Sequence, residues 1–212
     1  MHSVGNFNVD PVVCKNSDVV VVHNEYCSRR LDHRNVIIPH GCGGPFKCPP
    51  EEECKKGLSI DPRAPLVGYV GFISPYKGLE RVIEAMTKIP DAGLLIGGGW
   101  HTAGAETRYI EDLKRDSLDI LPGRCQWLGY VPDERLSTVY GAMRIVVYPS
   151  RMITESGALL MALSHGKAVI ASDLRAVREK RKLGALMTFK SVADLRRKIK
   201  RLLKDGEAPP RA

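Results

Sequence analysis

Apolar residues from position 66 onward follow two alternating patterns. Short uninterrupted apolar runs, typical of buried strands, alternate with longer stretches in which apolar residues recur every three or four positions, as on one helix face. The short runs predict strands at residues 66–72, 92–98, 125–128, 145–148, 168–171 and 185–189. The longer stretches predict helices at residues 77–88, 105–118, 133–143, 156–165 and 191–204.

Repeated strand–helix units favour a parallel sheet, because the chain must cross back over the sheet between neighbouring parallel strands. We therefore predict an α/β fold, a Rossmann-like parallel sheet with helices on both faces. Ligands of such sheets bind at the carboxyl ends of the strands. Polar loops that follow predicted strands are expected to open onto one crevice: residues 71–77, 97–101, 129–133 and 150–157.

The first part of the chain shows a different pattern. Short apolar runs at residues 18–23 and 36–39 predict two further strands. The stretch 43–64 combines several prolines with clusters of glutamate and lysine. Proline-rich, charged sequence of this kind is typical of a linker or an exposed loop rather than of a core element.

Composition indicates a folded globular protein, with 43% hydrophobic residues and a mean hydropathy of -0.17. No apolar run approaches the ~20 residues of a membrane-spanning helix, and residues 1–10 lack a signal-peptide pattern, so we predict a cytoplasmic protein. The net charge of +8 favours anionic partners: nucleotides, nucleic acid or an acidic membrane face. Much of the excess positive charge lies in residues 175–204, which form either a solvated basic helix face or a docking surface.

The six cysteines form no C-x-x-C pair, and the sequence therefore predicts no metal site. Free thiols are the expectation for a cytoplasmic protein. A disulfide among Cys42, Cys48 and Cys54 is the alternative that their spacing leaves open.

The strongest chemical signal lies at the helix start near residue 156. Ser156 and Gly157 can present backbone N–H groups that have no acceptor within the helix, and the helix dipole adds partial positive charge. A phosphate group is the expected ligand. Thr154 adds a hydroxyl and Glu155 a carboxylate. Because a phosphate would repel Glu155, that carboxylate is expected either to face sugar hydroxyls or to complement the helix dipole.

Three other loops carry features of a ligand site. Lys77 stands at a predicted helix start, an unfavourable place for a cation, which favours phosphate binding over an ordinary surface role. Glycines at 97–99 permit close approach to a ligand or a tight turn, but Thr102 replaces the third glycine of a dinucleotide fingerprint, so we reject NAD. The backbone at Tyr130 and Val131 either hydrogen-bonds a nucleobase or is a plain connection.

Together these segments resemble the C-terminal, donor-binding half of GT-B glycosyltransferases of the retaining family 4 (group 1) type. Motifs match in order: VIIPHG at 36–41, GYVGFISPYKGLERVIEAM at 68–86, LLIGGGW at 94–100, WLGYVPDERLSTVY at 127–140 and YPSRMITESGALLMALSHGKAVIASD at 148–173. The resemblance covers roughly residues 18–190. It implies half of a GT-B fold. Residues 1–44 would be the remnant of an N-terminal domain and its crossover, 45–64 a linker or loop, and 65–212 the nucleotide-sugar-binding domain.

The resemblance also implies roles for particular residues. Lys77 would hold the diphosphate of the nucleotide-sugar and Glu155 would face the sugar, which makes these two the candidate catalytic residues. The donor-binding residues would be Gly71, Phe72, Gly98, Gly99, Tyr130, Val131, Arg151, Thr154, Ser156, Gly157 and Ala158. The substrate would be a UDP- or GDP-sugar. No cofactor and no metal is implied, because lysine, arginine and helix amides stabilise the leaving diphosphate.

Three departures from the family pattern bear on activity. Phe72 stands where the family has an arginine, and Arg151 is the candidate replacement. Met161 stands where the second glutamate of the family's E-x7-E motif grips the ribose. Of an N-terminal acceptor domain, this sequence is expected to contain only about the last strand, at residues 18–23. His23 lies too close to the crossover to be that domain's active-site histidine.

Two functions follow from this comparison. The first is a transferase that moves a hexose from a nucleotide-sugar to an unidentified acceptor, with the acceptor site supplied by a partner chain, a second copy or the membrane surface. The second is a non-catalytic donor-domain remnant that binds nucleotide or a partner protein. Nucleic-acid binding is disfavoured, because no aromatic residues are interleaved with the basic ones. The basic C-terminal helix could instead meet an anionic membrane peripherally.

Overall fold

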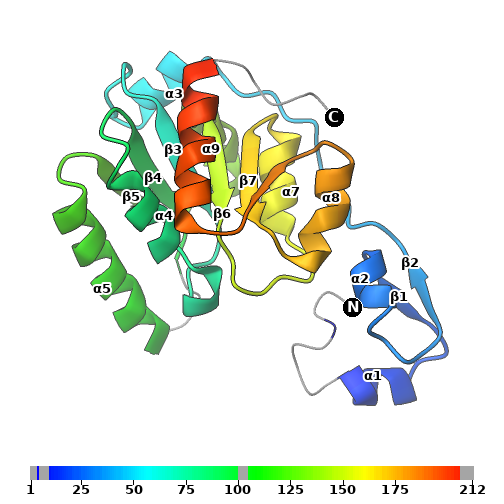
Figure 1. The fold of residues 1–212 in the computed structure, drawn as a ribbon. Helices are drawn as coiled ribbons and strands as arrows, with labels where there is room; N and C mark the ends of the chain where they lie inside the picture. The colour runs from blue at the N-terminus through cyan, green and yellow to red at the C-terminus, as the bar shows by residue number, and fades with distance from the viewer. Residues whose placement is uncertain (1–3, 5–9, 100–104, 206–212) are drawn as a thin grey trace.

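The computed structural model describes residue 4, residues 10–99 and residues 105–205. Their centre is a six-stranded sheet with the strand order β5-β4-β3-β6-β7-β8 (Figure 1). Every neighbouring pair in this sheet is parallel, which confirms the predicted α/β, Rossmann-like fold. The strands are β3 (Leu66–Val70), β4 (Gly93–Gly97), β5 (Cys125–Gly129), β6 (Ile145–Tyr148), β7 (Ala168–Ser172) and β8 (Met187–Phe189).

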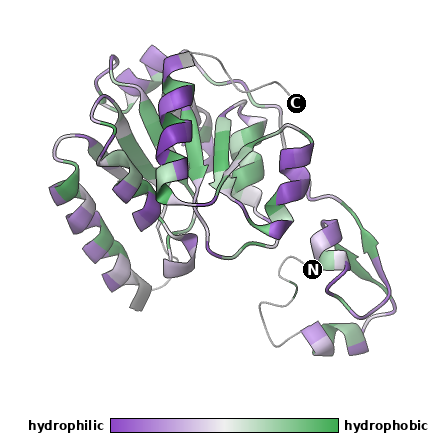
Figure 2. Cartoon of the chain, viewed as in Figure 1, coloured by the Kyte–Doolittle hydropathy of each residue, from purple (hydrophilic) through white to green (hydrophobic). Residues whose placement is uncertain are grey.

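Helices cover both faces of this sheet. One face carries α4 (Glu80–Met86), α5 (Ala105–Ile120) and α9 (Val192–Asp205), with α4 packed against the other two (Figure 1). The other carries α3 (Glu51–Gly57), α6 (Asp133–Ala142) and α7 (Gly157–Ser164). Because both faces are covered, the central strands are buried along their whole length. They form the apolar centre of the molecule in Figure 2.

The C-terminal helix α9 contributes its apolar stripe to this core. Leu195 and Ile199 are fully buried, and Val192 and Leu202 pack against the core from its edge. The predicted amphipathic helix is therefore confirmed, and its apolar side faces α4 rather than solvent.

The helix expected to begin at Lys77 begins instead at Glu80. Residues Pro75–Lys77 form a 3-10 turn, η1, and Gly78 ends it with a φ of 66° in the left-handed region. A residue in that conformation cannot continue a helix, and glycine adopts it at little cost. Lys77 therefore lies in the loop before α4 rather than in its first turn. A second unpredicted segment, η2 (Arg175–Val177) followed by α8 (Arg178–Lys182), connects β7 to β8.

Helix α3 lies within residues 45–64, where we predicted a linker or loop. Three glutamates at its start and two lysines at its end complement the helix dipole. Cys54 and Leu58 belong to the main core, because α3 packs against α6. The prediction was wrong for this helix because proline also permits a helix start: Pro50 precedes the first turn, where a missing N–H costs nothing. The division of the chain into three parts stays a prediction.

Residues 10–38 form a small second unit beside the main sheet (Figure 1). The predicted strands are confirmed as a parallel pair, with residues 20–22 beside residues 35–37. Helix α2 contacts η2, which brings it to the carboxyl edge of the main sheet. The elements are α1 (Asp10–Lys15), β1 (Val20–Val22), α2 (Glu25–Ser28) and β2 (Asn35–Ile37).

The described residues bear on two expectations about the whole chain. All six cysteines are free thiols, so the disulfide alternative is not realised. Cys48 and Cys54 instead donate weak hydrogen bonds to the carbonyl oxygens of His165 and Pro49. Within the ranges given above, none of the helices has the length and apolar character that crossing a bilayer requires.

Candidate functional site

A cavity of about 430 Å³ opens at the carboxyl ends of β3, β4 and β6. Loops that follow three different strands and the start of α7 converge on it, as the parallel topology predicts. Every sequence-predicted site residue except Arg151 and Thr154 lines this cavity. The lining residues are Tyr69, Val70, Gly71, Phe72, Lys77, Gly98, Gly99, Tyr130, Val131, Tyr148, Glu155, Ser156, Gly157 and Ala158.

Backbone hydrogen bonds hold the glycine loops of the cavity together. The Gly71 amide donates to the Gly97 carbonyl at 3.0 Å, and the Gly98 amide donates to the Gly129 carbonyl at 2.7 Å. Gly98 has a φ of +144°, and a Cβ at that position would lie 1.8 Å from the carbonyl oxygen of Gly71. Only glycine allows the two loops to come this close. One wall of the cavity therefore consists of two backbone segments without side chains. The Trp100 and His101 end of this loop lies outside the described residues.

The start of α7 forms another wall. Ser156 is the N-cap, and its hydroxyl accepts from the Leu159 amide at 3.2 Å. The Ser156 amide was expected to be available to a ligand, but it donates to Glu155 Oε1 at 2.9 Å. A ligand at this helix start would therefore meet the amides of Gly157 and Ala158. Tyr148 helps to hold the first turn of α7 in place, because its buried hydroxyl donates to the Ala158 carbonyl at 2.6 Å.

Glu155 lines the cavity with a carboxylate that is already engaged. Lys180 Nζ lies 2.8 Å from both carboxylate oxygens, and Asn24 Nδ2 donates to Oε2 at 3.3 Å. Burial raises the pKa of the Glu155 carboxyl, but the hydrogen bonds and charge of Lys180, together with hydrogen bonds from Ser156 and Asn24, lower it by more. The pKa therefore lies below the usual 4.5, and the carboxylate is ionised at neutral pH.

Two cationic side chains were candidates for binding phosphate, and the structure separates them. Lys77 lines the cavity, with its ammonium 4.9 Å from the ring centroid of Tyr76. Arg151 forms an exposed ion pair with Glu80 and does not line the cavity. Thr154 is buried, and its carbonyl accepts from Asn24 Nδ2 at 2.7 Å. Arg151 and Thr154 thus lie outside the group of residues that meets at the cavity.

Three polar residues near the cavity were missed at the sequence level. Asn24 and Lys180 reach Glu155 from elements distant in sequence. His40 lies over the start of α7, with Cε1 and Nε2 each 3.9 Å from the position a Gly157 Cβ would take. The motif VIIPHG at 36–41 contains this histidine and was the available signal. For Asn24 and Lys180 no local pattern marks the contact.

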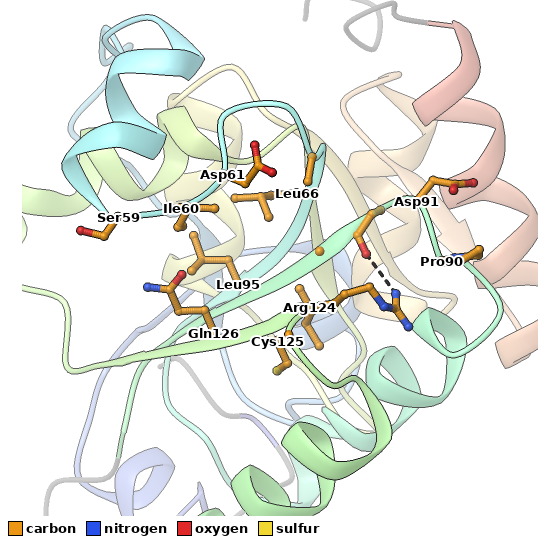
Figure 3. Close-up of a pocket in the computed structure, with 15 residues that line it drawn as sticks. Ser59, Ile60, Asp61, Leu66, Pro90, Asp91, Leu95, Arg124, Cys125 and Gln126 are labelled. Carbon is orange, nitrogen blue, oxygen red and sulfur yellow. Dashed lines mark hydrogen bonds between the residues drawn. The ribbon is translucent and has the colours of Figure 1, made fainter.

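A second cavity, of about 560 Å³, lies at the amino ends of β3, β4 and β5 (Figure 3). Asp61, Asp91 and Arg124 are among its lining residues. The Arg124 guanidinium is engaged by the backbone, since Nη1 donates to the carbonyl oxygens of Ile89 at 2.9 Å and Ala92 at 3.1 Å. Sheets of this type bind ligands at the opposite edge, so the cavity at the carboxyl ends is the candidate site.

Comparison with protein families and curated proteins gives consistent matches. The sequence model of the family described as "Glycosyl transferases group 1" matches residues 50–212. A D-inositol 3-phosphate glycosyltransferase from Mycobacterium sp. (strain KMS) is 30% identical over 161 residues, covering 74% of this chain and 36% of the relative. A 2-deoxystreptamine glucosyltransferase from Streptomyces kanamyceticus is 27% identical over 163 residues, covering 73% of this chain and 40% of the relative. The chain thus spans well under half of the length of these relatives.

Solved structures share the fold over nearly the whole chain. Anabaena Alr3699/HepE, crystallised in complex with UDP and glucose, superposes with a TM-score of 0.86 at 17% identity, covering 99% of this chain and 62% of that one. Sucrose-phosphate synthase (tll1590) from Thermosynechococcus elongatus gives a TM-score of 0.78 at 27% identity, covering 93% of this chain and 52% of that one.

Proposed function

Because the chain belongs to the group 1 glycosyl transferase family, we propose that it binds a nucleotide-sugar in the cavity at the carboxyl edge of its sheet and provides the donor half of a hexosyl transfer. The nucleotide-sugar is a UDP- or GDP-hexose, and the transfer retains the anomeric configuration. One observation carries this proposal: the loops that resemble the family's donor-binding motifs line a single cavity. The solved relative that contains UDP and glucose has the same fold, which supports a ligand of this class.

The diphosphate is assigned to the start of α7. The amides of Gly157 and Ala158 and the positive end of the helix dipole attract an anion there. Lys77 lines the same cavity and adds a full positive charge. As the bond to the sugar breaks, negative charge grows on the leaving diphosphate, and these groups stabilise it without a reorganisation of solvent. With that charge supplied by the chain, the proposed reaction needs no metal ion and no cofactor.

The nucleoside is assigned to the glycine-rich wall. Gly98 and Gly99 leave backbone exposed at close range, and the neighbouring Tyr130 and Val131 offer peptide groups to the edge of a base. Tyr130 is 75% exposed, so its ring is also accessible to a stacked base. The sugar would then lie toward Glu155.

The acceptor site is proposed to come from polypeptide beyond these residues, either a partner chain or a second copy. The curated relatives are longer than this chain, which supports that assignment.

Contact with an anionic membrane is a separate proposal, and it rests on charge alone. Helix α9 buries its apolar stripe, whereas Lys200 and Arg201 stay exposed. Sedimentation with anionic and neutral vesicles tests this contact. Binding that is equal for both vesicle types would contradict it.

A non-catalytic nucleotide-binding protein is the second candidate. Phe72 is 50% exposed and lines the cavity where the family has an arginine, and Arg151 does not replace that charge. A bound diphosphate would then be held but poorly stabilised as a leaving group. Turnover separates the two candidates, because the second predicts nucleotide binding without hydrolysis or transfer of the sugar.

The test is titration calorimetry with UDP, GDP, UDP-glucose and GDP-mannose, followed by assays of sugar release and transfer. Lys77→Ala should weaken binding of the preferred nucleotide about tenfold, as expected for loss of one charged contact. Lys88→Ala is the matched control, since Lys88 is exposed near the end of α4 and does not line the cavity. If none of the four ligands binds the wild-type chain, the proposed function is wrong.

A further inference from the structure

The wall of the candidate cavity carries an acidic residue at the point where an anion is expected. Glu155 directly precedes the amides of the α7 start and lines the same cavity. Its side chain is only 4% exposed, so water screens its charge poorly. An unpaired carboxylate at this place would repel a diphosphate and offset the attraction of the helix dipole for that anion.

Lys180 of α8 removes this conflict. Its ammonium lies 2.8 Å from Oε1 and 2.8 Å from Oε2 of Glu155, and its side chain is 18% exposed. The contact joins residues 25 positions apart, one in the loop that leads into α7 and the other in α8. The pair therefore presents an almost neutral surface to the cavity, although it contains two full charges.

Neighbouring groups hold this pair in place. Asn24 donates to the Thr154 carbonyl and to Glu155 Oε2, and its own Oδ1 caps helix α2 by accepting from the Cys27 amide. Glu179, next to Lys180, accepts from the amides of Glu25 and Tyr26 at the same end of α2. The acidic neighbour of Lys180 is thus engaged by α2, which leaves the ammonium directed at Glu155.

We propose that Lys180 is a positioning residue for anion binding: it neutralises and orients Glu155, so that the start of α7 accepts the diphosphate of the nucleotide-sugar. The inference rests on the proposed function for the identity of the ligand. It assigns Lys180 an indirect role, because the residue acts through Glu155 and does not itself line the cavity. The effect is confined to charged ligands, and an uncharged nucleoside should bind equally well with or without the ion pair.

The experiment is a double-mutant cycle with Lys180→Met, Glu155→Gln and the combined variant. Lys182→Met is the matched control, because Lys182 ends the same helix and is exposed. Calorimetry at about pH 8, well above the ordinary pKa of a glutamate, gives Kd values for inorganic pyrophosphate, UDP or GDP, and the corresponding nucleoside. Thermal unfolding of each variant reports whether it is folded.

Lys180→Met should raise the Kd for the nucleoside diphosphate and for pyrophosphate by about tenfold or more, because it leaves a bare buried carboxylate beside the anion. The nucleoside should bind within about twofold of wild type, as should every ligand in Lys182→Met. The combined variant should recover diphosphate binding to within about threefold of wild type, because it removes both charges. Lys180→Arg should retain binding, since it preserves the charge.

Glu155→Gln keeps the inference testable if Lys180→Met does not fold. It leaves the Lys180 charge unopposed, so diphosphate should bind more tightly than in wild type while the nucleoside is unaffected. Unchanged or weaker diphosphate binding in Glu155→Gln overturns the inference, as does an equal loss of nucleoside and diphosphate binding in a folded Lys180→Met. Wild-type protein that binds pyrophosphate but neither nucleotide contradicts the proposed function alone, and the cycle is then read with pyrophosphate. Wild-type protein that binds none of the anions overturns both.

Discussion

A Cβ atom on Gly98 would lie 1.8 Å from the carbonyl oxygen of Gly71, so the loops after β3 and β4 meet backbone to backbone. This contact joins the two loops that form the glycine-rich wall of the cavity. It also explains why both residues are glycine, since each has a positive φ, +150° at Gly71 and +144° at Gly98.

Substitution of Gly98 by alanine should therefore be costly. Gly98→Ala must move one of the two loops, and we expect a loss of about 2–3 kcal/mol in the free energy of unfolding, measured by urea denaturation. Gly99→Ala is the control, because a Cβ there meets nothing within 4 Å and its φ is not positive. Equal stability of the two variants would show that the loops do not pack as described.

Lys55 should stabilise the chain although it lies far from the cavity. Its side chain is 0% exposed, and its ammonium contacts the Glu51 carboxylate and the carbonyl oxygens of Pro62 at 3.1 Å and Ala64 at 2.8 Å. Lys55→Met should lower the free energy of unfolding by about 2–4 kcal/mol, because these buried acceptors lose their donor. The exposed neighbour Lys56 provides the control. Lys56→Met should change the free energy of unfolding by no more than about 0.5 kcal/mol. A small effect at Lys55 would mean that α3 is not docked as observed.

Acid should weaken the Glu155–Lys180 ion pair. The pKa of Glu155 is lower in the folded chain than its ordinary value of 4.5, so the ionised form is favoured by folding. Its contribution to stability is complete above that ordinary value and is lost as the pH falls through the folded-state pKa. The free energy of unfolding of wild type and of Glu155→Gln should be measured between about pH 6 and pH 3. The difference between the two proteins should shrink as the pH falls. A constant difference would contradict the assignment of the shift to this pair.

Arg151 should matter little for nucleotide binding. Its ion pair with Glu80 is exposed, with side chains 59% and 39% accessible, and an exposed pair contributes about 0–1 kcal/mol. Arg151→Ala should leave the Kd of the preferred nucleotide within about twofold of wild type and lower stability by less than about 1 kcal/mol. A loss as large as that of Lys77→Ala would instead identify Arg151 as the second cation, as the sequence had suggested.

Most residues that line the cavity could be predicted from the sequence, because this prediction does not depend on the order of the strands in the sheet. Loops that follow parallel strands share one edge of a sheet, so Gly71, Gly98, Tyr130 and Gly157 could be grouped before their distances were known. Lys77 lines the same cavity, although the helix expected to begin at this residue begins three residues later. The place of Arg151 was not predictable, because Arg151 lies in the loop after β6 and its partner Glu80 belongs to α4, 71 residues earlier in the chain.

Amino-acid order by itself determined the alternation of strands and helices, and with it the α/β class and the edge at which a ligand would bind. The physical reason is local: strands buried on both faces require continuous apolar runs, and helices with one buried face require apolar residues at helical spacing. Only the tertiary structure decided that α3 docks on α6, that Glu155 takes the Ser156 amide, and that Lys180 and Asn24 reach Glu155 across 25 and 131 residues. Such contacts depend on how separate elements are oriented once the core is packed, and no periodic pattern in the sequence records that orientation.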